Sequence, residues 1–224
     1  MLRPDWGTVR GFIDTFRRFL PHRFDSEPII DADALAEFVA TRAAFIAQTS
    51  LYGYLKNRMG TRYTQLFQDD VYVASINRAK WQVYAACLSD LTVFSVGYCG
   101  GNQRLSDAQC TRFAQMIFDD VVRREFIDDD ARDAVDEAQA AFQTRLGFAD
   151  WATVGKGETA FTQSPGELVK AAPVAEHFKE DDREIVMNSI RFRWKNVREQ
   201  LRKRADAAAI AGDWLSRDGS DAEG

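Results

Sequence analysis

The chain has 224 residues, 46% hydrophobic and 28% charged, which are the proportions of a globular protein. Its 16 Phe and 5 Trp exclude a disordered chain, and 14 Gly and 3 Cys are too few for a collagen-like or disulfide-scaffold protein. A formal net charge of −5 argues against a protein that coats nucleic acid over its whole surface.

The first predicted element is an amphipathic helix over residues 6–20. Its apolar side chains recur at helical spacing on one face: Val9, Phe12, Ile13, Phe16, Phe19 and Leu20. Such a helix docks on a partner or lies in a membrane interface, although a helix packed on its own domain has the same pattern. The residues expected to bind a protein partner or an anionic membrane surface are Trp6, Arg10, Phe12, Phe16, Arg17 and Arg18.

A change in composition after this helix predicts the domain limits. Pro21 ends the helix, because proline disfavours helical geometry in the residue before it. We therefore expect an N-terminal helix and linker over 1–30 and a helical bundle domain over 31–215. The last segment, 216–224, is expected to be an acidic disordered tail.

The second predicted helix begins at Asp31 or Asp33, which are both good N-caps, and ends at Gly60. Every seventh residue along it is large and apolar, which indicates a core-facing face of a bundle. These residues are Phe38, Phe45, Tyr52 and Met59.

The end of this helix is also a candidate anion-binding site. Lys56, Arg58 and Arg62 flank Gly60 together with tyrosines. Cations in these positions also satisfy the last carbonyls of a helix, so a purely structural role stays open.

The third predicted helix covers about 70–96 and is followed by glycine-rich residues 97–102, which we expect to form a loop. In that loop Cys99 should be exposed, whereas Cys87 and Cys110 lie on apolar stripes and should be buried. Three cysteines at these spacings predict neither a disulfide framework nor a zinc site, and they favour a cytoplasmic chain.

The C-terminal half continues the helical pattern. Ser106 and Gln109 form a capping box in the sequence, which predicts a helix directly behind it with Cys110, Phe113, Ile117 and Val121 buried. Further helices are expected over 131–146 and from Ser164. Residues 147–173 are rich in Gly, Thr, Ser and Pro and predict a loop-rich segment. A long final helix is expected over about 181–215.

Charge is unevenly distributed along this half. Residues 191–204 contain seven cations and one carboxylate, whereas 119–137 contain nine carboxylates and three arginines. The basic stretch allows nucleic-acid binding as a second alternative function, although the acidic stretch could equally neutralise it within the fold. We therefore do not expect nucleic acid to be the partner.

The sequence contains no catalytic, cofactor or metal motif that stands out. Its two histidines, His22 and His177, lack the Glu three residues earlier that a di-iron bundle needs. Ser95 comes nearest to a nucleophile motif, but the first glycine of that motif is missing. We therefore predict no catalytic residue, no cofactor and no metal.

Two segments resemble a little-studied group of bacterial all-helical proteins. They are SLYGYLKNRMGTRY, from Ser50 to Tyr63, and SINRAKWQVYAACLSDL, from Ser75 to Leu91. Members of the group are sometimes labelled esterase, so the resemblance implies a helical fold and an esterase-like hydrolase as the first alternative. No catalytic residue is carried over from it, because this chain has no matching serine motif.

Helical periodicity in every long segment predicts an all-α, single-domain bundle of about six helices. The function we expect is that of a non-enzymatic cytoplasmic adaptor or assembly factor. It would bind a protein partner, and its N-terminal helix would allow it to lie at the inner membrane as a peripheral protein.

Overall fold

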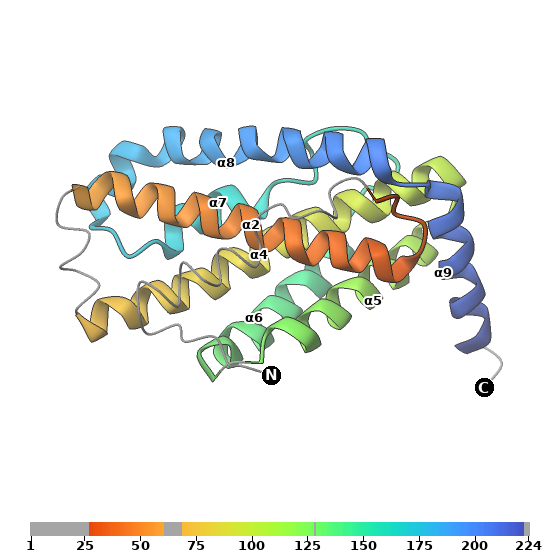
Figure 1. Cartoon of the computed structure of the whole chain (residues 1–224), viewed down its shortest axis with the longest axis horizontal. Helices are drawn as coiled ribbons and strands as arrows, with labels where there is room; N and C mark the ends of the chain where they lie inside the picture. Colours follow the sequence, from red (N-terminus) through yellow and green to blue (C-terminus); the bar gives the residue numbers. More distant parts are fainter. Residues whose placement is uncertain (1–26, 61–68, 128, 222–224) are drawn as a thin grey trace.

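The computed structural model describes residues 27–60, 69–127 and 129–221, which form an all-α bundle (Figure 1). The expected fold class is confirmed. Its helices, in chain order, are α2 (Ala32–Met59), α4 (Asp70–Gln103), α5 (Asp107–Glu125), α6 (Asp129–Leu146), α7 (Gln163–Ala171), α8 (Glu176–Arg204) and α9 (Ala207–Asp221). Within these ranges the extended backbone pairing is a single isolated bridge between Ile29 and Ala205.

Helix α4 is the centre of the bundle. It packs against α2, α5, α6, α7 and α9, and its stretch from Ala79 to Gly100 is buried on nearly all sides, as an apolar central helix should be. Its length and composition would also allow it to cross a membrane, but most of its apolar stretch is buried inside the bundle. Helix α8 packs on α2 and α7, along the upper edge of Figure 1, with α5 and α6 on the opposite side.

Several helix ends lie where the sequence predicts them. The Asp31 side chain accepts a hydrogen bond from the backbone N–H of Ala34 at 2.7 Å, and Gly60 ends α2 with a positive φ of 53°. The capping box of Ser106 and Gln109 is present at the start of α5.

The glycine-rich segment 97–102 is not the loop that its composition predicts, because α4 continues through it to Gln103. The glycines allow close packing here. A Cβ on Gly97 would lie 2.6 Å from Cγ2 of Val154, and one on Gly100 would lie 2.5 Å from Sγ of Cys110. Cys99 is consequently fully buried, and the prediction that it is exposed is wrong.

The expected final helix is two helices, α8 and α9. The helix is interrupted at Ala205. There the backbone carbonyl of Ile29 accepts a hydrogen bond from the N–H of Asp206 at 2.9 Å, and the N–H of Ile29 donates one to the carbonyl of Arg204 at 2.9 Å. Ile29 is buried in this contact, so the bundle begins before the expected boundary at residue 31. The Asp206 carboxylate then caps α9, accepting the N–H groups of Ala208 and Ala209.

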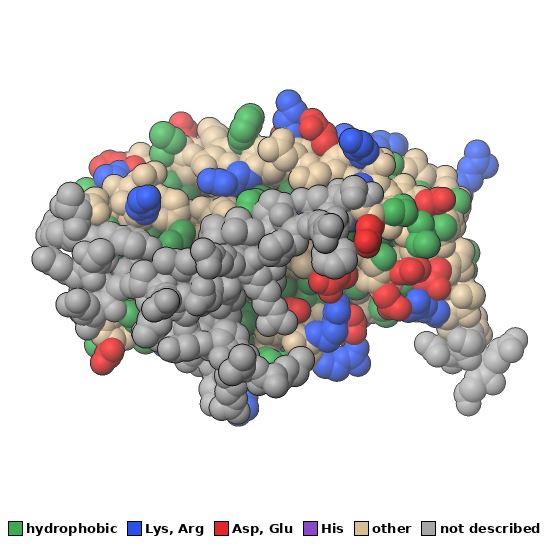
Figure 2. Space-filling model, in the orientation of Figure 1, with side chains coloured by type: hydrophobic (Ala, Val, Ile, Leu, Met, Phe, Trp, Pro, Cys, Tyr) green, Lys and Arg blue, Asp and Glu red, His purple; other side chains and the backbone are tan. Residues whose placement is uncertain are grey.

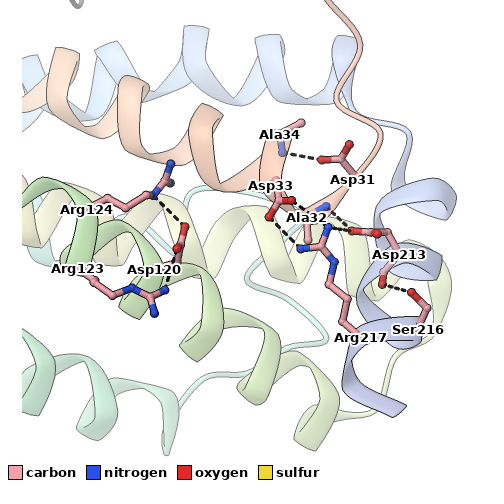
Figure 3. A network of polar contacts seen from close by, with 10 residues as sticks. All are labelled: Asp31, Ala32, Asp33, Ala34, Asp120, Arg123, Arg124, Asp213, Ser216 and Arg217. Atoms are coloured by element: carbon pink, nitrogen blue, oxygen red, sulfur yellow. Dashed lines mark hydrogen bonds and ion pairs between the residues drawn. The ribbon is translucent and has the colours of Figure 1, made fainter. Parts of the chain in front are cut away.

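Helix α9 also includes residues 216–221, which the sequence assigned to a disordered tail. Arg217 holds it against α2, because its guanidinium pairs with Asp33 at 2.9 Å and with Asp213 at 2.9 Å (Figure 3). Asp213 in turn accepts the N–H of Ala32, and Asp218 pairs with Arg112 of α5. Asp218, an acidic residue of the expected tail, therefore makes a contact between helices.

Candidate functional site

Helix α8 has two faces of different character. Its inner face is apolar and packs against α2 and α7, with Val186, Ile190, Trp194, Val197 and Leu201 buried. Trp194 is fixed there, because its indole Nε1 donates a hydrogen bond to Oγ of Ser164 at 3.0 Å. The orientation of the whole helix is therefore set by its inner face.

The outer face of α8 carries large apolar side chains in solvent. Phe178, Ile185 and Phe192 follow one another at intervals of seven residues, so they lie along one line of the helix. Their exposed fractions are 37%, 71% and 71%. We call these three residues the outer apolar stripe. Figure 2 shows apolar side chains along the upper edge of the molecule, where α8 lies.

Charge changes sign along the same helix. Its first nine residues, 176–184, contain five carboxylates and two cations, and residues 191–204 contain seven cations and one carboxylate. In Figure 2 acidic side chains lie towards the left of the upper edge and basic ones towards the right. Acidic residues near the helix N-terminus and basic ones near its C-terminus complement the helix dipole.

The acidic end of α8 is tied to the end of α2. The guanidinium of Arg58 donates two hydrogen bonds to the Asp182 carboxylate and lies 4.6 Å from the centre of the Phe178 ring. Hydrogen bonding from Arg58 lowers the pKa of Asp182. Burial, with the Asp182 charge as a second cause, raises the pKa of Tyr54 to about 12.

The ion pair of Arg58 and Asp182 engages one residue of the candidate anion-binding site, which was predicted from Lys56, Arg58 and Arg62. Arg58 already holds a carboxylate of its own chain, so its charge is engaged within the fold. Lys56 is exposed, and Arg62 lies outside the described residues. Arg58 therefore serves the contact between α2 and α8.

The candidate docking residues of the N-terminal helix lie outside the described residues. They are Trp6, Arg10, Phe12, Phe16, Arg17 and Arg18. The interpretation of that segment stays a prediction from sequence.

The basic end of α8 contacts its neighbouring loops and leaves cations in solvent. Arg198 pairs with Glu158 at 2.7 Å, and Arg202 donates to the backbone carbonyl of Lys156 at 2.7 Å. In the acidic stretch, Asp120 pairs with Arg123 and Arg124 of its own helix (Figure 3). Both of these ion pairs of Asp120 are local to α5.

Sequence reasoning missed a buried polar network around Asp90 of α4. This carboxylate is fully buried and accepts the backbone N–H and the hydroxyl of Ser164, at 2.8 and 2.6 Å, and the N–H of Gln163. Arg145 of α6 donates to it at 2.8 Å and also to Ser89. Asp90 thus caps α7 and joins it to α4 and α6, which is a structural role. The signal was a single carboxylate within the apolar stretch of α4 from Trp81 to Gly100.

A small cleft opens beside this network, between α4, α6 and α7. Five alanines line it together with a few polar side chains, among them Gln82, Glu137, Arg145 and Glu167. Its volume of about 100 Å³ is well below the several hundred Å³ typical of sites for small organic ligands.

The serines singled out above are poorly placed for attack on an ester in solution. Ser95 is fully buried within α4, and the Ser164 hydroxyl is buried and donates to Asp90. His177 lies on the exposed start of α8, beside the Phe178 ring. Among the described residues no group of three or more His, Cys, Asp or Glu could hold a metal ion.

Comparisons of the chain with protein-family models, with curated proteins and with solved structures find no match. The class that the fold defines is the all-α helical bundle. Within it, the outer apolar stripe and the charges beside it are the surface feature best suited to binding.

Proposed function

We propose that the chain is a non-enzymatic adaptor or assembly factor that binds a protein partner through the outer face of α8. The observation that carries this proposal is the outer apolar stripe. Single exposed apolar residues are common, but three large ones on one line of a helix resemble the contact residues of helix-mediated recognition. Cations and carboxylates beside them would orient the partner.

The stripe is rigid, which favours recognition. Five apolar residues fix the inner face of α8, and the Arg58–Asp182 pair fixes its beginning. A partner that binds the stripe would therefore lose little affinity to ordering of the helix.

The N-terminal segment is a second proposed contact, on the strength of its sequence. Trp6, Phe12 and Phe16 would enter a groove of a partner or the interface of an anionic membrane, and Arg10, Arg17 and Arg18 would attract the negative charge. On this proposal the protein is cytoplasmic and reaches the inner membrane as a peripheral protein.

Affinity capture from the native cell, read by quantitative mass spectrometry, tests the proposal. Ile185→Glu places a charge in the middle of the stripe, and Phe148→Glu changes a residue that is still more exposed, 86% in solvent, in the loop after α6. We expect proteins that copurify with the wild type and the Phe148→Glu variant to be depleted at least about tenfold with Ile185→Glu. Equal recovery with all three chains would contradict a binding role for α8.

A further inference from the structure

The outer face of α8 is self-complementary about its central residue. Phe178 and Phe192 are each seven residues from Ile185, so the stripe reads Phe, Ile, Phe in both chain directions. An isologous interface requires this property, since the same patch must fit itself after a two-fold rotation. A two-fold axis beside Ile185 would bring Phe178 of one copy next to Phe192 of the other.

The charges select the direction of such a pairing. The acidic residues 176–184 lie on one side of Ile185 and the basic residues from Arg191 onward lie on the other. In antiparallel helices related by an axis at Ile185, residues 176–184 of one copy lie beside 186–194 of the other, so each acidic part lies beside Arg191 and Arg193 of the other copy. Parallel helices would place acid beside acid and base beside base, which is repulsive.

We propose that two copies of this chain associate through an antiparallel contact between their α8 helices, with the two-fold axis beside Ile185. This inference rests on the proposed function, because it names the protein that occupies the outer apolar stripe. Ile185 and Phe192 are both 71% exposed, so the contact requires no opening of the bundle.

The extent of the contact determines its strength. The stripe from Phe178 to Phe192 spans about 21 Å of helix. Its three side chains alone cannot bury the roughly 800 Å² per partner that a stable dimer usually buries. The chain should therefore exchange between monomer and dimer with protein concentration. Added salt should weaken the dimer, because charges beside the stripe such as Asp181, Glu184 and Arg191 are exposed.

Sedimentation velocity of the full chain over a range of concentrations tests association. We expect a reversible dimer whose dissociation constant rises at least about tenfold with Ile185→Glu and is unchanged with the matched variant Phe148→Glu. Circular dichroism establishes that both variants are folded. A chain that stays monomeric at all concentrations, or a dimer that Ile185→Glu leaves intact, would overturn the proposal.

Disulfide trapping tests the direction. The native cysteines, Cys87, Cys99 and Cys110, are buried, so an added surface cysteine is the accessible thiol among the described residues. When Phe178→Cys and Phe192→Cys chains of different mass are mixed and oxidised, we expect the mixed disulfide to dominate. Dominance of the two homodimers would indicate parallel helices and overturn the proposal.

Two results separate this inference from the proposed function. If the chain is monomeric but Ile185→Glu loses a different captured protein, the self-association is wrong and the adaptor function stands. If the dimer forms as expected but capture finds no other protein, the self-association stands and the adaptor function fails.

Cross-linking of an Ile185→Cys chain to its own residues before Glu27 would place the N-terminal segment on this face and overturn the dimer.

Discussion

Asp90 shows how one buried carboxylate can organise several helices. Burial raises its pKa, against the lowering effects of Arg145 and of the hydrogen bonds from Ser164. It is the shared acceptor for the start of α7 and for a guanidinium from α6. Removal of its side chain leaves all these donors without their acceptor.

We predict that Asp90→Ala lowers the free energy of unfolding by about 3–5 kcal/mol, as expected when a buried ion pair loses one partner. Asp33→Ala, which removes a pair whose Asp33 side chain is 79% exposed, is the control and should cost less than about 1 kcal/mol. Urea denaturation measures both. Equal losses would show that the Asp90 network contributes no more than a surface pair.

The contact between α4 and the loop after α6 gives a second prediction at this scale. A Cβ on Gly155 would lie 2.3 Å from the carbonyl carbon of Gly97, so the loop would have to move away from the helix. We expect Gly155→Ala to destabilise the fold by about 1–3 kcal/mol. Gly101→Ala, which meets no atom within 4 Å, should leave stability unchanged or raise it by up to about 1 kcal/mol. Thermal denaturation distinguishes the two, and an equally stable Gly155→Ala chain would contradict the close contact.

At the scale of elements, the sequence predicted the helices well and their ends less well. Periodic apolar residues and caps located α2 and α5, because these signals are local. The course of α4 through Gly97 and Gly100 depends on close contacts with Val154 and Cys110, and residues far along the chain supply those contacts. The break between α8 and α9 similarly depends on Ile29, which is far from it in the sequence and pairs with Arg204 and Asp206 there.

Helix α9 is held by ion pairs, which makes its attachment dependent on pH. Hydrogen bonds from Arg217 and Arg112 lower the pKa values of Asp33 and Asp218. A carboxyl whose pKa is lower in the folded state stabilises the fold above its unfolded pKa of about 4. This stabilisation is lost as pH falls through the folded value.

We therefore predict that the double variant Arg112→Gln, Arg217→Gln unfolds at a lower temperature than the wild type at pH 5 to 7, and that the two converge towards pH 3. The control is Arg191→Gln, because the Arg191 guanidinium donates a hydrogen bond to the uncharged side chain of Asn188. Its effect should change less with pH. A difference that persists in full at pH 3 would contradict an ionic attachment of α9.

At the scale of the whole molecule, the candidate site could be predicted only in part. The sequence indicated that α8 has an apolar face and a basic end, but it did not indicate the outer stripe. The spacing of Ile190, Trp194, Val197 and Leu201 predicts a covered face, and the fold buries these residues, but Phe178, Ile185 and Phe192 were not part of that prediction. Which of two apolar faces is buried depends on the neighbouring helices.

The N-terminal segment should be separable from the bundle. Ile29 is buried and pairs with Arg204 and Asp206, so a shortened chain must keep residues from Glu27 onward. We predict that a chain beginning at Glu27 keeps nearly the same thermal midpoint but no longer sediments with anionic vesicles at low salt. The arginines removed would each contribute about 1 kcal/mol at such a surface. An insoluble or molten shortened chain would instead place the N-terminal helix in the core.

The central claim is that the outer face of α8 binds a protein, and photo-cross-linking in the native cell tests it most directly. A photoreactive amino acid is placed at Ile185 or Phe192, and at Phe148 as the still more exposed control. We predict covalent protein adducts at positions 185 and 192, whether with a second copy or with another protein, and few at 148. No adduct at 185 and 192, or an equal yield at 148, would contradict the claim.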